Sequence, residues 1–171
     1  YAAIARECGQ NSRDVPMSLP VEIKFNLRSV VSQEFPFLAS QSEAVKQCLQ
    51  KAIKNGDEKE MEFFLRASHV LNQPSIPILL VEDRNTKGLT GPSEPGTPFH
   101  SLVKASGVSN KESETSGGSF GIGKFAAFAA SEIQAVLYAT LHPDPEAGGP
   151  VFLAQGKTIL MSHAALNGDQ R

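Results

Sequence analysis

Hydrophobic and polar residues follow two different periods near the start of the chain. Residues 2–14 (AAIARECGQNSRD) place Ile4 and Cys8 on one side at helical spacing, which predicts a helix that ends before Val15-Pro16. Residues 21–28 (VEIKFNLR) alternate strictly between apolar and polar, which predicts a half-buried strand. The residues predicted to face inward from this strand are Val21, Ile23, Phe25 and Leu27.

Two further helices are predicted before residue 71. Ser40 and Glu43 match a capping box at a helix start, and Asn55-Gly56 is a typical helix end. The apolar stripe between these two signals consists of Val45, Cys48, Leu49, Ala52 and Ile53. Residues 58–70 predict the next helix, and its inward residues are predicted to be Met61, Phe64 and Leu65.

Beyond residue 75, a long segment without periodicity separates apolar elements. Residues 76–83 (IPILLVED) form a nearly continuous apolar run, which suits a central strand covered on both faces. Residues 84–118 show no periodic pattern, and a loop of this length in a compact domain is commonly a functional lid or disordered. Residues 123–131 (GKFAAFAAS) predict a helix, residues 132–142 a strand, and residues 151–161 a further strand or hairpin.

The predicted order of elements is helix, strand, two helices, strand, lid, helix, strand, strand. This order favours an α+β fold in which a mixed sheet carries helices on one face. The 171 residues suffice for a single domain covering residues 1–171. Because the chain begins at Tyr1, we expect it to be part of something longer.

Composition narrows the classes of partner. The net charge is −2, so direct contact with nucleic acid has no support from a basic surplus. The sequence contains no run of about 18 apolar residues, so no membrane span is expected. Cys8 and Cys48 are the only cysteines, which favours a reducing, cytoplasmic setting. The four histidines lack the spacing of zinc ligands: His69, His100, His142 and His163.

Three polar residues share one face of the first predicted helix. Glu7, Asn11 and Asp14 are spaced i, i+4, i+7. One interpretation is a solvated helix face. The other is a catalytic set, because an Asn side-chain oxygen suits Mg²⁺ and a nearby Glu can activate water for attack on a phosphate.

A carboxylate and a glycine-rich turn follow the apolar strand. Asp83 lies at the carboxyl end of this strand, where sheet proteins often place ligands. Asn85, Gly88 and Gly91 then allow the backbone to approach a ligand closely. The alternative is an ordinary strand end with turn residues.

Residues 117–125 (GGSFGIGKF) contain four glycines directly before a predicted helix. Successive backbone N–H groups there can bind an anion, and the helix N-terminus adds a favourable dipole. The segment resembles a P-loop, but Phe125 replaces the Ser or Thr that would hold magnesium, and no apolar strand precedes it. A flexible linker is the remaining alternative.

Together these segments resemble the three signatures of the GHKL ATPases, which include gyrase, heat-shock chaperones, histidine kinases, MutL and microrchidia proteins. ECGQNSRD (7–14) resembles E-x-x-x-N-x-x-D, VEDRNTKGLTG (81–91) resembles the D-x-G-x-G signature, and GGSFGIGK (117–124) resembles G-x-x-G-x-G. The resemblance covers about residues 1–165 and implies a Bergerat fold, a two-layer α/β sandwich with a mixed, mostly antiparallel sheet and helices on one face. Residues 88–118 would be the ATP lid.

The resemblance also implies roles for individual residues. Glu7 would be the general base, Asn11 the Mg²⁺ ligand, and Asp83 the acceptor for the adenine amino group. Asp14 would support the nucleotide. The remaining residues predicted to bind nucleotide are Gly88, Gly118, Ser119, Phe120, Gly121, Ile122, Gly123 and Lys124, of which Lys124 is expected to contact phosphate.

The chain departs from the family pattern in two places. Asn85 stands where the first glycine of the second signature would be, and Thr86-Lys87 precede Gly88 as an insertion, so the adenine side of the pocket is expected to differ. The family's last G-T motif is not identifiable after residues 158–163, and we expect a domain truncated at its C-terminus.

The sequence therefore predicts an ATP-binding, Mg²⁺-dependent ATPase domain. Lid closure would couple to homodimerisation or to movement of a missing C-terminal effector domain. Two alternatives stay open: a histidine-kinase-like or non-hydrolysing nucleotide sensor, and an interaction domain that binds no nucleotide.

Overall fold

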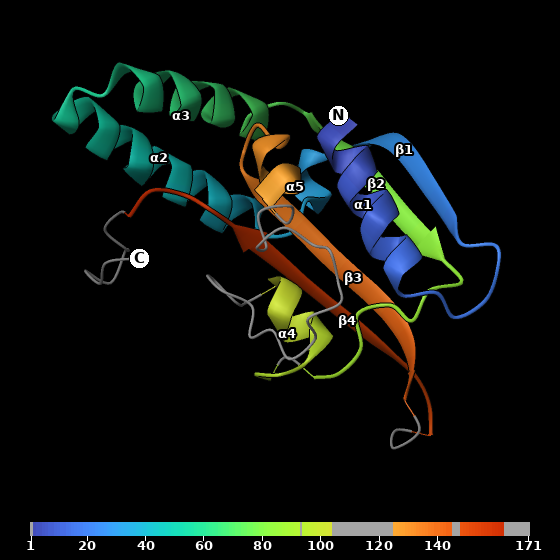
Figure 1. Cartoon of the computed structure of the whole chain (residues 1–171). Coiled ribbons are helices and arrows are strands. Elements are labelled where there is room, and N and C mark those ends of the chain that lie inside the picture. The colour runs from blue at the N-terminus through green and yellow to red at the C-terminus, as the bar shows by residue number, and fades with distance from the viewer. Residues whose placement is uncertain (1, 93, 104–124, 145–147, 163–171) are drawn as a thin grey trace. The chain divides into compact units, whose positions relative to one another are not determined.

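The computed structural model describes residues 2–92, 94–103, 125–144 and 148–162. In this part of the chain, helices are mixed with two small antiparallel sheets, which pair β1 with β2 and β3 with β4. The elements in chain order are α1 (Ala2–Asp14), β1 (Glu22–Val31), the 3₁₀ helix η1 (Ser32–Glu34), α2 (Leu38–Asn55), α3 (Glu58–Leu71), β2 (Ser75–Arg84), α4 (Pro98–Val103), α5 (Phe125–Ala129), β3 (Ala135–Asp144) and β4 (Gly149–Thr158) (Figure 1).

The chain divides into two compact units, each assembled from separate segments. The first unit contains residues 1–25, 81–130 and 136–157. The second contains residues 26–80, 131–135 and 158–171. The first unit therefore holds α1, α4 and α5 together with most of β3 and β4, whereas the second holds the pair α2 and α3.

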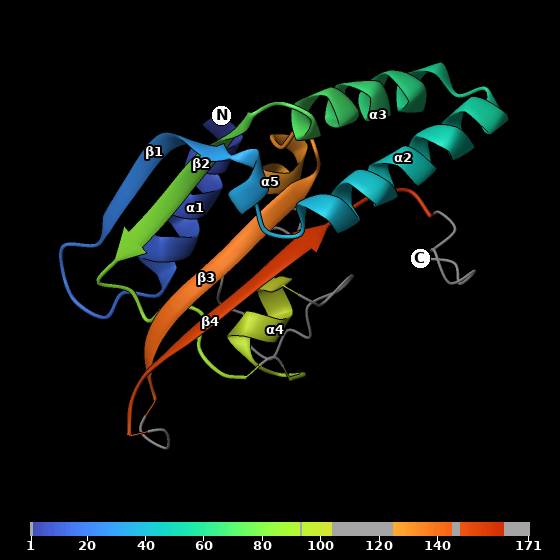
Figure 2. The same ribbon diagram turned by 180° about the vertical axis from the view of Figure 1, so that it is seen from behind.

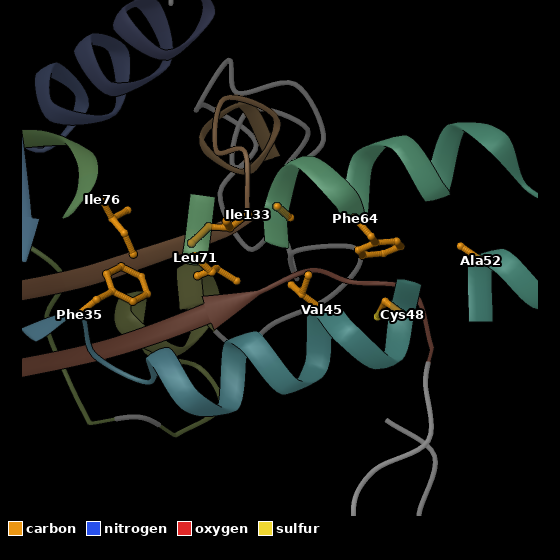
Figure 3. Packing of buried hydrophobic residues seen from close by; sticks show 9 residues of the cluster. Phe35, Val45, Cys48, Ala52, Phe64, Leu71, Ile76 and Ile133 are labelled. Carbon is orange, nitrogen blue, oxygen red and sulfur yellow. The ribbon is translucent and has the colours of Figure 1, made fainter. Parts of the chain in front are cut away.

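The second unit is organised around the packing of α2 against α3, which lie side by side in both views (Figures 1 and 2). Buried positions on α2 recur at i, i+4, i+7 and i+11, which is the stripe expected of a helix with one covered face. Figure 3 shows how the side chains from both helices meet. The buried cluster consists of Phe35, Val45, Cys48, Ala52, Phe64, Ala67, Leu71, Ile76 and Ile133.

A buried glutamine connects α2 to two later segments of the second unit. The Gln41 side-chain amide donates to the Ile133 carbonyl at 3.2 Å. Its side-chain oxygen accepts a hydrogen bond from the Thr158 hydroxyl at 2.9 Å. Because a buried amide without partners is costly, these two bonds fix where the chain passes beside α2.

Both helices of this pair were predicted, but details of their ends and faces differ. The predicted capping box is wrong: α2 starts at Leu38, and the Ser40 hydroxyl lies in the first turn, where it donates to the Phe37 carbonyl at 3.0 Å. Ile53 and Leu65 were predicted to face inward, yet each is 56% exposed. Ile53 directly follows the buried Ala52, and Leu65 directly follows the buried Phe64. Each is therefore rotated off the covered stripe of its helix.

Replacement of glycine by alanine is expected to have opposite effects on stability at Gly56 and at Gly9. Gly56 caps α2 at φ +70°, whereas Gly9 has ordinary helical geometry within α1, and an added Cβ meets nothing within 4 Å at either site. We expect Gly56→Ala to lower the free energy of unfolding by about 1 kcal/mol, because alanine strains at positive φ. Gly9→Ala should raise it by about 0.5–1 kcal/mol. Chemical denaturation of both variants measures the difference, and equal signs would contradict it.

In the first unit, α1 begins the chain and α5 packs on it. Ile4 of α1 and Phe128 of α5 are both buried, at 6% and 4% exposure. The helix over residues 2–14 is confirmed with the boundaries that the sequence predicted. Helix α5 is shorter than predicted within the described residues, because residues 130–134 turn into β3.

The first strand is confirmed, but its predicted inward face holds only at Val21 and Ile23, which are half-buried. Phe25 is 44% exposed and Leu27 is 78% exposed, whereas Asn26 is half-buried. Alternation decides which side chains share a face of a strand, but burial also needs a covering layer. Strand β2 is half-buried along most of its length rather than covered on both faces.

Helix α4 lies inside the segment that was predicted to have no pattern. The hydroxyl of Thr97 accepts a hydrogen bond from the backbone N–H of His100 at 3.2 Å, and Pro98 is the first helical residue. Threonine followed by proline is a known helix-start signal, so Thr97-Pro98 was the clue in the sequence. The buried side chains of this helix are Phe99 and Val103.

Candidate functional site

The first signature lies on α1. Since residues 2–14 are helical, Glu7, Asn11 and Asp14 lie on one side of the helix as predicted. Glu7 is half-buried, whereas Asn11 and Asp14 are exposed. The Glu7 carboxylate is therefore partly shielded from solvent, whereas the side-chain oxygen of Asn11 is accessible.

A hydrogen bond joins the first and second signatures. The Ser12 hydroxyl donates to Oδ2 of Asp83 at 2.8 Å, across 71 residues of chain. Ser12 is buried, at 6% exposure, while the Asp83 side chain is exposed. A carboxylate has about four acceptor positions, so Asp83 can be held by Ser12 and still accept from a ligand.

Charges cluster around the Cys8 thiol between these two signatures. Burial raises the pKa of Cys8 above its usual value, and the carboxylates of Glu7 and Asp83 raise it further. Burial likewise raises the pKa of Tyr138 on β3, with a smaller contribution from Cys8. Side chains from α1, β2 and β3 therefore surround one small region, in which the thiol stays protonated at neutral pH and is a poor nucleophile.

The segments that follow α1 and β2 are tied together by backbone hydrogen bonds. Pro16 and Thr86 form an antiparallel bridge, and the Lys87 N–H donates to the Val15 carbonyl at 2.9 Å. The Met17 N–H donates to the Asn85 carbonyl at 2.8 Å. These bonds hold the end of α1 beside the turn after Asp83, so the chain segments that follow the two signatures are fixed next to each other.

Asn85 adopts a turn conformation that is uncommon for residues other than glycine. Its φ is +63°, a left-handed conformation that glycine adopts freely and asparagine tolerates better than most residues. Its side-chain amide donates to the Pro20 carbonyl at 2.7 Å, which stabilises this turn. Asn85 therefore takes a backbone conformation that glycine adopts more readily than other residues.

Gly88 is required where the turn meets β3. Its φ is +66°, and a Cβ built there would lie 2.9 Å from the Thr140 hydroxyl oxygen. That hydroxyl accepts a hydrogen bond from the Leu89 N–H at 3.1 Å. Gly88 thus lets the backbone after Asp83 pack directly on the β3 side chains.

Asn11 near Glu7 suits a Mg²⁺ ion that is held mainly by water and substrate phosphates. In the described ranges, no three His, Cys, Asp or Glu residues group as a metal cage. Mg²⁺ commonly keeps several waters and takes one or two protein ligands plus substrate phosphates. The side-chain oxygen of Asn11 is accessible and lies one turn from Glu7, so it could be one of these few protein ligands.

The structure brings together some of the predicted site residues and leaves others untested. Glu7, Asp83 and Gly88 lie in one region of the first unit, and Asn11 and Asp14 extend from it along α1. Ser12 and Thr140 were not predicted. Ser12 continues the stripe of Ile4 and Cys8 at i+4, so a serine in an apolar stripe was the available signal. The residues of the third signature that were predicted to bind nucleotide lie outside the described residues: Gly118, Ser119, Phe120, Gly121, Ile122, Gly123 and Lys124.

Other features of the described chain involve none of these residues. An open hollow of about 260 Å³ is lined by residues of α2 and α3 in the second unit, including Glu43 and Lys46. It shares no residue with the predicted site, and its lining combines alkyl, hydroxyl and amide groups with one acidic and one basic side chain. Both cysteines are free thiols. None of the helices described here has the length and apolar character that crossing a bilayer requires.

Comparisons of the chain with family models, with curated proteins and with solved structures find no match. The interpretation of the site consequently depends on the residues and their geometry.

Proposed function

We propose that this chain is an ATP-binding domain that hydrolyses ATP with Mg²⁺. The observation that carries the proposal is the Ser12–Asp83 hydrogen bond of 2.8 Å, because it joins two sequence signatures that are 71 residues apart. Resemblance of short motifs is weak evidence when the motifs are scattered. It gains weight when the residues proposed for adenine, water and metal belong to one compact unit.

Asp83 would select the base. Its carboxylate accepts from Ser12 and is exposed, so it can also accept a hydrogen from the amino group of adenine. Guanine and hypoxanthine carry an oxygen acceptor at the same ring position, and two acceptors facing each other repel. The site would therefore prefer adenine nucleotides.

Glu7 and Asn11 would serve the phosphate end. The Glu7 carboxylate would take the proton of the attacking water, and the Asn11 oxygen would help to hold Mg²⁺. Mg²⁺, when bound, neutralises charge on the phosphate oxygens. The half-buried position of Glu7 limits its solvation, which suits a general base next to a reacting group.

The wider arrangement is proposed with the same function. The two small sheets and the helices would belong to a two-layer Bergerat sandwich, and residues 88–118 would form a lid that orders on the nucleotide. Lid closure would be coupled to homodimerisation or to a C-terminal effector domain. Two free thiols in the described chain are compatible with a reducing, cytoplasmic setting.

Nucleotide binding can be tested by thermal denaturation with and without ATP and Mg²⁺. A ligand at about 100 times its Kd stabilises the folded state by about 2.7 kcal/mol, which should raise the melting temperature by several degrees. ATP without Mg²⁺ and GTP with Mg²⁺ are the matched controls, and both should shift it less. An unchanged melting temperature at millimolar ATP would favour an interaction domain instead. Released phosphate identifies an ATPase, whereas label transferred to the protein from γ-labelled ATP identifies a kinase.

A further inference from the structure

One buried histidine of the first unit has an unused nitrogen. His142, on β3, is 4% exposed, and its Nε2 has no hydrogen-bond partner within the part of the chain that the structure describes. Buried side-chain nitrogens in folded proteins almost always have a partner, and an exception needs an explanation. A bound ligand or an ordered water is the usual one.

The other ring nitrogen decides what kind of partner Nε2 needs. Nδ1 lies 3.1 Å from the carbonyl oxygen of Pro143, and a carbonyl can only accept, so Nδ1 carries the proton. In this tautomer Nε2 presents a lone pair, and its missing partner is a hydrogen-bond donor.

His142 lies on the same face of β3 as Thr140, which meets the turn after Asp83. Residues two apart on a strand point to one side, so His142 shares its face with Thr140 and Tyr138. Thr140 contacts the turn at Gly88, and a Cβ placed on Gly88 would lie 3.9 Å from the His142 Cβ. The His142 side chain thus starts beside the turn that follows Asp83.

We propose that His142 is a specificity-determining residue that accepts a hydrogen bond from the adenosine part of the bound nucleotide. This inference rests on the proposed function. The triphosphate offers only acceptors to a lone pair, whereas adenosine offers three donor groups: the 6-amino group, the 2′-hydroxyl and the 3′-hydroxyl. His142 would then add a second acceptor to that of Asp83, so that bases or sugars lacking the donor bind less tightly.

The test combines variants with ATP analogues that each lack one donor. The variants are His142→Phe, which removes the acceptor, and His142→Gln, whose side-chain oxygen can replace it. The analogues are N6,N6-dimethyl-ATP, 2′-deoxy-ATP and 3′-deoxy-ATP, with Kd measured by calorimetry in Mg²⁺. His69→Phe, an exposed histidine of α3, is the control variant.

We expect His142→Phe to raise the Kd for ATP about 3- to 10-fold, the effect of one lost hydrogen bond. His142→Gln should recover part of the loss. One analogue should bind the wild type more weakly by a similar factor but lose no further affinity in His142→Phe, and that analogue identifies the donor. A residue that only packs would lower affinity for all four nucleotides equally.

Four outcomes overturn the inference in different ways. If the wild type binds ATP and His142→Phe binds it equally, His142 makes no contact and only this inference fails. If every analogue retains the same ratio between wild type and variant, the effect is structural. If His142→Phe does not fold, equal wild-type affinity for ATP and all three analogues rejects a donor contact. If the wild type binds no ATP, the proposed function fails first.

Discussion

Replacement of Glu7 by alanine is expected to abolish most ATP hydrolysis while leaving ATP bound. A positioned general base contributes about 10²- to 10⁴-fold to rate, so phosphate release should fall by that factor. Glu7 is not expected to touch the base or the ribose, and the Kd for ATP should stay close to that of the wild type. Steady-state phosphate release and calorimetric Kd separate the two quantities.

The Glu7 prediction needs an isosteric variant and a neutral control. Glu7→Gln keeps the size of the side chain and removes only the basic oxygen, so it should be as slow as Glu7→Ala. Glu22→Gln changes an exposed glutamate of β1 in the same unit and should keep the wild-type rate. Hydrolysis by Glu7→Ala at the wild-type rate would remove Glu7 from the mechanism, whatever the affinity for ATP.

The sequence predicted the helix of the first signature well because its information is local. Apolar spacing defined residues 2–14, and Val15-Pro16 defined the end. The spacing of Glu7, Asn11 and Asp14 on one face follows from the same helical period. These inferences need no knowledge of which other elements are nearby.

Inferences that depended on distant partners were less successful. The exposure of Leu27 and of Leu65 could not be read from alternation or helical spacing, because each depends on what covers the element. The partnership of Ser12 with Asp83 joins residues far apart in the chain, and only the fold brings them together. The positive φ of Asn85 also became visible only in the structure, because it depends on how the turn after β2 is held.

Replacement of Asp83 is expected to have the largest effect on nucleotide binding. Asp83→Ala removes a charged acceptor, and hydrogen bonds to charged groups contribute about 1.5–3 kcal/mol, so the Kd for ATP should rise about 10- to 150-fold. Preference for ATP over ITP should shrink as well, because the group that distinguishes an amino donor from an oxygen acceptor is gone. Competition titrations with both nucleotides measure this change.

Ser12→Ala tests whether the 2.8 Å hydrogen bond positions Asp83. This variant keeps the carboxylate but releases it from its donor, so affinity should fall less than in Asp83→Ala, by about 2- to 5-fold. In the double variant, loss of Ser12 should add almost nothing to loss of Asp83, because Ser12 acts through that side chain. Asp57→Asn, at a helix cap where asparagine serves equally well, should leave binding unchanged. Additive losses in the double variant would show that Ser12 and Asp83 act separately, and the link between the two signatures would then be structural only.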